Sequence, residues 1–220
     1  ARLLIELGMA DGRCGVRSLD QGLALARLIR DLPGVALHGV EGYEGLVFSD
    51  HAKQDAVEIN GYLGGLLGFH HRLRQEALLA DPEGSILTAG GSAYYDLVAR
   101  ALAGEAPGAT IVLRSGCYVT HDSGFYRELL SRMDDRAALG EPPRLRPALE
   151  VWAHVQSLPE PGFAVIALGK RDVAYDAGLP VPLRRYKAGV VPAIGDDVSA
   201  CKVTAVMDQH AFMTVAPGVD

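Results

Sequence analysis

A glycine-rich turn is the first feature of the sequence that could do chemistry. Gly90, Gly91 and Ser92 stand where the apolar run "ILTA" gives way to a stretch of helical character. Glycines often end strands and serine often caps helices, so the turn has a purely structural interpretation. A bare glycine turn at a helix N-terminus also exposes backbone N–H groups to an anion such as phosphate. The neighbouring loops decide between the two interpretations.

Three other loops are similarly polar and also follow predicted strands. They contain Gly8, Asp11, Gly12 and Arg13 in the first loop, Glu41, Gly42, Tyr43 and Glu44 in the second, and Ser115, Gly116, Cys117, Tyr118, His121 and Asp122 in the last. Each loop alone is weak evidence, because strand-to-helix loops are normally polar and contain glycine. Together with the glycine turn they favour a phosphate site.

Arginine and tyrosine side chains would reach the same place. The planar guanidinium of Arg13 suits an anionic ligand oxygen, although a surface pair with Asp11 is the structural alternative. Phenols would come from Tyr43, Tyr94, Tyr95 and Tyr118, of which about half are expected to be core residues with a hydrogen-bonded hydroxyl. The histidines show no compact metal-ligand spacing. His70 and His71 are expected to face solvent, which leaves His121 and His210 as the histidines of interest.

Strand and helix patterns alternate over the first part of the chain. Strands are predicted at 2–7, 35–43, 85–90 and 109–116, and helices near 18–31, 50–79, 92–103 and 123–132. This alternation predicts a parallel sheet with right-handed crossovers. Four such units are half of an eight-fold barrel, whose active site lies at the carboxyl ends of its strands. The polar loops would therefore converge there.

The pattern changes after the Pro-rich segment 140–147. Extended segments at 149–158, 162–168 and 202–215 predict an antiparallel β-rich domain. The predicted fold class is therefore α/β: the second half of a (β/α)8 TIM-type barrel at 1–140, followed by an incomplete β-rich domain at 141–220. We expect at least four further βα units before Ala1, and further chain after Asp220.

Composition excludes several classes of partner. The chain is 49% hydrophobic and 22% charged, with a formal net charge of -6. Scattered basic residues argue against nucleic acid or an anionic membrane as a partner. No apolar run reaches the ~20 residues of a membrane span, and no signal peptide is evident, so a cytoplasmic protein is expected. The three cysteines are widely spaced, which indicates reduced thiols.

Six segments, taken in chain order, resemble a known family. They are "ELGMADGRCGVRS", "GVEGYEGL", "ILTAGGSAYYD", "RSGCYVTHDSGFY", "VWAHVQSLPEPGFAVIALGKRDVAYD" and "MDQHAF". This ordered set is similar to the pyridoxal-phosphate enzymes that include D-threonine aldolase and D-serine dehydratase. Within that group it most resembles bacterial amino acid deaminases of the D-serine deaminase type.

The resemblance implies an alanine-racemase-like barrel, a β-domain, a homodimer and bound pyridoxal phosphate. It implies that Gly90, Gly91 and Ser92 hold the phosphate, with Tyr94 or Tyr95 nearby. It also implies that Arg13, Tyr43, Gly116 and Tyr118 border the pyridine ring or the phosphate. The substrate implied is a small D-amino acid.

Two family features are missing from these residues. The Schiff-base lysine of the family lies in a Pro-His-x-Lys-like context, which none of Lys53, Lys170, Lys187 and Lys202 shares, so the catalytic lysine is unassigned. The family's His-x-Cys or His-x-Asp metal pair, which would hold a divalent metal such as zinc or manganese, is also absent. We therefore assign no metal ligand in this sequence.

Three functions follow from the resemblance. The first is a lyase that converts a D-hydroxy amino acid such as D-serine to a keto acid and ammonia. The second is aldol cleavage of D-threonine-like substrates to glycine and an aldehyde. The third is a truncated, non-catalytic barrel that still binds pyridoxal phosphate.

Overall fold

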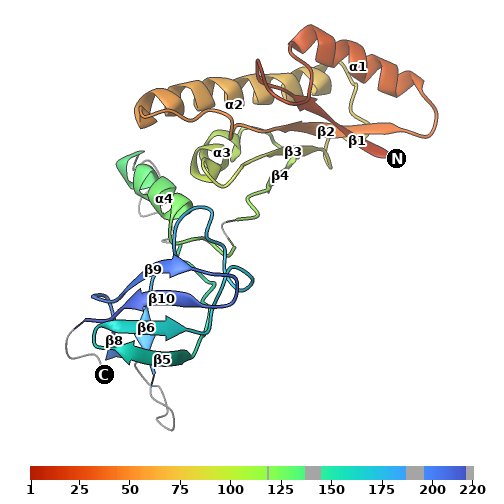
Figure 1. Ribbon diagram of the computed structural model, residues 1–220. Coiled ribbons are helices and arrows are strands. Elements are labelled where there is room, and N and C mark those ends of the chain that lie inside the picture. The colour runs from red at the N-terminus through yellow and green to blue at the C-terminus, as the bar shows by residue number, and fades with distance from the viewer. Residues whose placement is uncertain (118, 137–144, 187–195, 217–220) are drawn as a thin grey trace. The chain divides into compact units, whose positions relative to one another are not determined.

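The chain forms two compact units, Ala1–Ala148 and Leu149–Asp220 (Figure 1). The computed structural model describes residues 1–117, 119–136, 145–186 and 196–216. The predicted boundary between residues 140 and 141 lies outside these ranges. The fold is mixed α/β, with a parallel sheet in the first unit and antiparallel strands in the second, as the sequence predicts.

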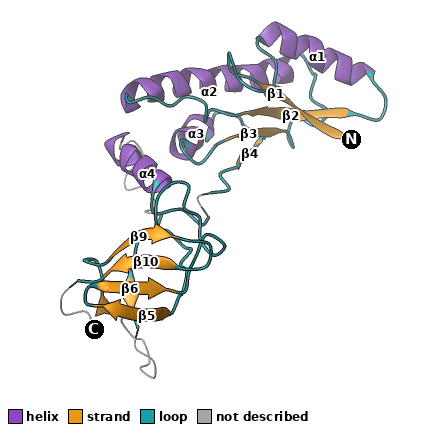
Figure 2. Ribbon diagram, in the orientation of Figure 1, coloured by secondary structure: helices purple, strands orange, loops and turns teal. Residues whose placement is uncertain are grey.

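The first unit alternates strands and helices (Figure 2). Its elements are β1 (Arg2–Leu7), α1 (Leu19–Asp31), β2 (Ala36–Gly42), α2 (Ala52–Gln75), β3 (Ile86–Ala89), α3 (Tyr95–Leu102), β4 (Thr110–Leu113) and α4 (Phe125–Arg136). The strands are parallel and lie in the order β1-β2-β3-β4. Their carboxyl ends therefore meet at one edge of the sheet.

Helices α1 and α2 pack together along the sheet (Figure 1). Helix α1 begins where the side chain of Ser18 accepts the N–H of Gln21 at 3.2 Å, which is a serine N-cap. Helix α2 contributes the largest apolar face of the core. Its fully buried residues recur at helical spacing and are Ile59, Leu63, Leu66, Phe69 and Leu73. No helix among the described residues combines the length and apolarity that a membrane crossing requires.

The expectation that His70 faces solvent is wrong. His70 is fully buried on α2, and its Nε2 lies 2.9 Å from the hydroxyl of Ser85, which is also buried. Burial lowers the pKa of His70 to about 4, with smaller contributions from His71 and Arg74. His71 is half-buried, and its Nε2 lies 2.8 Å from the Glu105 carbonyl oxygen. The core face of α2 therefore includes a histidine.

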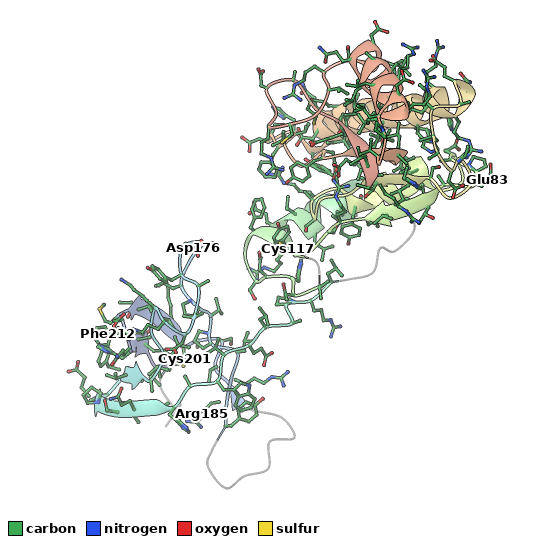
Figure 3. The ribbon with its side chains drawn as sticks, turned by 90° about the vertical axis from the view of Figure 1, so that its right-hand side faces the viewer. Glu83, Cys117, Asp176, Arg185, Cys201 and Phe212 are labelled. Atoms are coloured by element: carbon green, nitrogen blue, oxygen red, sulfur yellow. The ribbon has the colours of Figure 1, made fainter. Side chains whose placement is uncertain are left out.

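The second unit is built from antiparallel strands. They are β5 (Val155–Glu160), β6 (Phe163–Ile166), β7 (Arg184–Arg185), β8 (Asp196–Asp197), β9 (Lys202–Val206) and β10 (Ala211–Thr214). Four of them form a sheet in the order β5-β6-β10-β9, while β7 and β8 pair separately. A small core joins Leu168, Val203, Val206 and Ala211. Figure 3 labels Cys201 and Phe212 in this unit.

The start of β5 differs from the sequence prediction. The strand begins at Val155 rather than near residue 149. Upstream of it, the exposed Trp152 stacks on Tyr186 with ring centroids 4.8 Å apart. The β-forming residues of this segment thus contribute an aromatic pair rather than additional sheet.

Candidate functional site

The candidate site lies at the carboxyl ends of β1 to β4, and Tyr62 of α2 joins the first two of them. The Tyr62 hydroxyl donates to the carbonyl of Leu7 at 2.6 Å and accepts the N–H of Tyr43 at 3.0 Å. Burial is the main reason that the pKa of Tyr62 rises to about 12, and the nearby Glu44 and Glu6 add to it. Tyr62 therefore stays neutral and fixes the backbone of Tyr43.

Arg13 and Tyr43 lie together, from different loops. The Arg13 guanidinium carbon is 5.4 Å from the centroid of the Tyr43 ring. Arg13 is exposed and Tyr43 is half-buried, so the aromatic face supports the cation while leaving it accessible. The structure thus brings together two of the residues predicted from sequence.

The backbone amides of the glycine turn bind a carboxylate of the protein itself. The carboxylate of Glu44 accepts the N–H of Gly90 at 3.1 Å and the N–H of Gly91 at 2.6 Å. The Glu44 side chain is completely buried. A Cβ at position 91 would lie 3.0 Å from the Tyr43 ring and 3.4 Å from a Glu44 oxygen. The two amides expected to face a phosphate therefore donate to Glu44 in this structure.

The carbonyl side of the same turn is held by β4 and the residues after it. The buried Ser115 hydroxyl lies 3.0 Å from the carbonyls of both Gly90 and Gly91, and the backbone N–H of Arg114 donates to Gly90 at 3.2 Å. The Arg114 guanidinium also donates to the Thr88 hydroxyl and to the Gly42 carbonyl, each at 2.8 Å. Arg114 thus links the ends of β2, β3 and β4.

Helix α3 begins later than expected. The sequence predicts its start at Ser92, but the helix starts at Tyr95 with Tyr94 in the N-cap position. The glycine amides are bonded to Glu44, and the buried Tyr94 hydroxyl donates to the carbonyl of Val47 at 2.7 Å. These anchors extend the turn to residue 94. Tyr94 is thus anchored in the core, while Tyr95 is half-buried.

The first turn of α4, next to the loop that follows β4, adds a phenol that the sequence did not single out. The hydroxyl of Tyr126 interacts with the Cys117 thiol and with the Ser92 hydroxyl, close to Tyr43. The Cys117 interaction and burial raise the pKa of Tyr126. Gly116 and Cys117 are exposed, and Figure 3 shows Cys117 in this loop. The predicted site residue Tyr118 lies outside the described residues.

His121 is a buried residue of the same loop. Its exposed fraction is 7%, and neither ring nitrogen has a hydrogen-bond partner in the described part of the chain. Its ring centroid lies 6.4 Å from that of Tyr126, and its backbone φ is 53°. Over residues 1–117, 119–136, 145–186 and 196–216, no group of three or more His, Cys, Asp or Glu side chains could hold a metal ion.

Sequence reasoning missed the roles of four residues. Glu44 was noticed only as a polar loop residue, and Arg114 was read as part of a strand. Tyr126 stands in the segment "HDSGFY", which carries the resemblance but gave no role to its tyrosine. Tyr62 had no sequence signal, because a tyrosine on a helix resembles any partly buried aromatic residue.

The chain is similar to a curated protein and to several solved structures. It is 26% identical over 218 residues to a protein named D-threonine aldolase from Arthrobacter sp., covering 98% of this chain and 49% of that protein. The family described as "Putative serine dehydratase domain" matches residues 148–220.

Two solved structures share the fold. D-threonine aldolase from Filomicrobium marinum gives a TM-score of 0.64 at 19% identity, over 97% of this chain and 49% of that one. D-threo-3-hydroxyaspartate dehydratase from Delftia sp. HT23 gives a TM-score of 0.59 at 21% identity, over 99% of this chain and 53% of that one. The chain spans about half the length of each of these proteins. The sequence relative, the matched domain and the fold together support the D-threonine aldolase and D-serine dehydratase-like family for this chain.

Proposed function

We propose that the protein is a pyridoxal-phosphate-dependent lyase that converts D-serine or a similar D-hydroxy amino acid to a keto acid and ammonia. The observation that carries this proposal is the convergence of Arg13, Tyr43, Ser92 and Cys117 at the carboxyl ends of four parallel strands. The same loops carry the family resemblance. The named relatives act on D-threonine and D-threo-3-hydroxyaspartate, which are also D-hydroxy amino acids.

The proposal includes the architecture that such an enzyme needs. The parallel sheet would be half of a (β/α)8 barrel spanning residues 1–140 here, followed by a β-domain at 141–220. A homodimer, a cytoplasmic location and a divalent metal complete the proposal.

The chemistry of the donors present fits the cofactor. The Ser92 and Tyr126 hydroxyls can donate to phosphate oxygens, and the N–H groups of Gly116 and Cys117 have no acceptor among the described residues. Gly90 and Gly91 are bonded to Glu44, so they position the turn rather than remain open to a ligand. The residues that would hold the phosphate are therefore Ser92, Gly116, Cys117 and Tyr126.

The residues around the ring would orient the substrate and neutralise charge. When bound, pyridoxal phosphate supplies a ring that accepts the electrons released when a bond to Cα breaks. Arg13, held over Tyr43, provides a fixed positive charge beside the ring or the substrate carboxylate. Tyr62 keeps Tyr43 in place through its backbone.

The proposed activity is tested by product analysis of the purified protein supplied with pyridoxal phosphate. Pyruvate and ammonia in equal amounts from D-serine, with no product from L-serine, are expected. Intact mass after borohydride reduction should show one added pyridoxyl group. A protein that takes up the cofactor but turns over neither D-serine nor D-threonine would instead be the non-catalytic form.

Aldol cleavage is the second candidate, because the curated relative is named D-threonine aldolase. Glycine and acetaldehyde from D-threonine, without pyruvate from D-serine, would select it. Both reactions use the same ring and the same D-configured substrates, so the product identity alone separates them.

A further inference from the structure

The Glu44 carboxylate is the most completely enclosed charged group that the described residues hold. It is 0% exposed and is surrounded by Tyr43, the glycine turn and the β2–α2 loop. Burying a carboxylate is costly unless several donors satisfy it. Glu44 receives two backbone N–H groups at 2.6 and 3.1 Å, which are charge-assisted hydrogen bonds.

Both the N–H groups and the carbonyls of the glycine turn are hydrogen-bonded within the protein. Glu44 accepts the N–H groups of Gly90 and Gly91, and the Ser115 hydroxyl lies 3.0 Å from each of their carbonyls. The peptide groups of this turn are therefore engaged within the protein before any ligand arrives. The turn ends at Ser92, whose hydroxyl reaches the Tyr126 phenol.

A ligand phosphate and the Glu44 carboxylate cannot both use these two amides. Displacing Glu44 would leave a buried carboxylate without donors beside a second anion, and both changes are unfavourable. The other donors at the site are the Ser92 and Tyr126 hydroxyls, which interact with each other and can rotate toward a ligand, and the amides of Gly116 and Cys117, which have no acceptor among the described residues.

We propose that Glu44 is a positioning residue: it occupies the amides of Gly90 and Gly91, fixes Ser92, and so directs the ligand phosphate to Ser92 and to the loop after β4. This inference deepens the proposed function and rests on it for the identity of the ligand. It differs from the usual use of a glycine turn, in which the backbone amides bind the phosphate directly.

The first test follows the backbone amides by NMR in the purified protein while inorganic phosphate is added. The amide protons of Gly90 and Gly91 are expected downfield without ligand and unmoved by phosphate, whereas those of Gly116 and Cys117 shift. In Glu44→Ala the downfield positions should be lost. Phosphate-induced shifts of Gly90 and Gly91, with release of Glu44, would overturn the inference.

The second test compares pyridoxal phosphate with pyridoxal, which lacks the phosphate. Glu44→Gln keeps one oxygen acceptor but turns an NH2 group toward the other amide, so the turn and Ser92 should shift. We expect about tenfold weaker binding of pyridoxal phosphate and less than about twofold change for pyridoxal, since a lost charge-assisted contact is worth roughly a factor of ten or more.

Asp55 provides a matched control. It is also buried, at 3% exposure, and its carboxylate accepts the Ser49 N–H at 3.0 Å and the Ser49 hydroxyl at 2.6 Å. Asp55→Asn should lower stability without changing the ratio of the two affinities. A variant that only disturbs the fold should weaken the binding of pyridoxal phosphate and of pyridoxal equally. If Glu44→Gln has that effect, Glu44 has only a structural role.

The outcomes separate the two proposals. Phosphate shifts at Gly116 and Cys117 without any binding of pyridoxal phosphate would contradict the proposed function and leave the Glu44 inference standing. Binding of pyridoxal phosphate with phosphate-induced shifts at Gly90 and Gly91 would support the proposed function and contradict the Glu44 inference. A protein that binds neither compound contradicts both.

Discussion

His70 shows how one buried side chain can make stability depend on pH. The Ser85 hydroxyl lies 3.0 Å from the Pro82 carbonyl and donates to it, so Nε2 of His70 carries the proton that bonds to Ser85. The other ring nitrogen, Nδ1, is buried without a partner among the described residues. Protonation would therefore place a charge and an unpaired N–H in the core, next to Arg74.

The pH dependence has a definite sign. The folded pKa of His70 is lowered to about 4 from 6.5, so between these values the unfolded chain binds more protons than the folded one. Stability is expected to be fully present above pH 6.5 and to fall as the pH drops toward 4, by at most about 1.4 kcal/mol per pH unit. Urea unfolding at several pH values measures this slope.

His71 supplies the comparison for that measurement. It neighbours His70 on α2 but is only half-buried. His70→Gln should flatten the slope between pH 6.5 and 4, while His71→Gln should leave it close to that of the wild type. Equal slopes in wild type and His70→Gln would contradict the interpretation.

The closeness of the glycine turn to Tyr43 gives a second prediction. Gly91→Ala would place a methyl group 3.0 Å from the Tyr43 ring and 3.4 Å from Glu44. We expect a loss of about 1–3 kcal/mol in the free energy of unfolding, because overpacking forces neighbours to move. Gly64→Ala on α2, where no atom lies within 4 Å of the added Cβ, should be neutral or gain up to about 1 kcal/mol. Chemical denaturation of the two variants checks the difference.

At the scale of the elements, Arg114 holds three strand ends together. Its guanidinium donates to Thr88 and Gly42 and lies 3.6 Å from the Glu41 carboxylate. Arg114→Lys keeps the charge but loses the planar fork, so one of the two hydrogen bonds must be lost. A loss of about 1–2 kcal/mol is expected. The exposed Arg30, changed to Lys, should shift the urea midpoint by much less.

The sequence predicted the eight elements of the first unit closely. Helix α1 is an example, because a capping serine, an apolar stripe and Pro33-Gly34 act locally and within one helix. The start of α3 was predicted three residues early. The first residue of α3 depends on the hydrogen bond between Glu44 and the glycine turn, which are distant in sequence. Local helix propensity cannot predict such a contact.

The location of the candidate site could be predicted from the sequence, but its hydrogen-bond partners could not. Polar loops after parallel strands must gather at one edge, and Arg13 and Tyr43 do lie together there. Sequence could not reveal that Glu44 takes the glycine amides, because nothing in the residue order distinguishes it from the neighbouring Glu41. The same limit hid Tyr126 and Tyr62.

The described residues form two hydrophobic cores, one in each unit, which predicts two unfolding transitions. Every described helix lies in the first unit, whereas the single tryptophan of the sequence, Trp152, lies in the second and stacks on Tyr186. Circular dichroism at 222 nm and tryptophan fluorescence therefore report on different units.

Substitutions in each core test this independence. Leu66→Ala removes a fully buried side chain of α2 and should lower the dichroism midpoint in urea, at a cost of about 2–5 kcal/mol, without moving the fluorescence midpoint. Val203→Ala should have the reverse effect, since Val203 lies in the core of the β unit. A common shift of both probes in either variant would show that the units unfold as one.

The three free cysteines differ in exposure, and this turns them into chemical reporters. Cys14 and Cys117 are exposed, whereas Cys201 is buried in the β unit. The Cys117 thiol interacts with Tyr126, which also interacts with Ser92. The rate at which Cys117 is alkylated therefore reports whether a ligand is bound at the loop after β4. Alkylation of Cys201 requires opening of the β unit and reads its local unfolding. A single labelling time course can therefore follow ligand binding and domain opening in the same sample, with each peptide identified by mass.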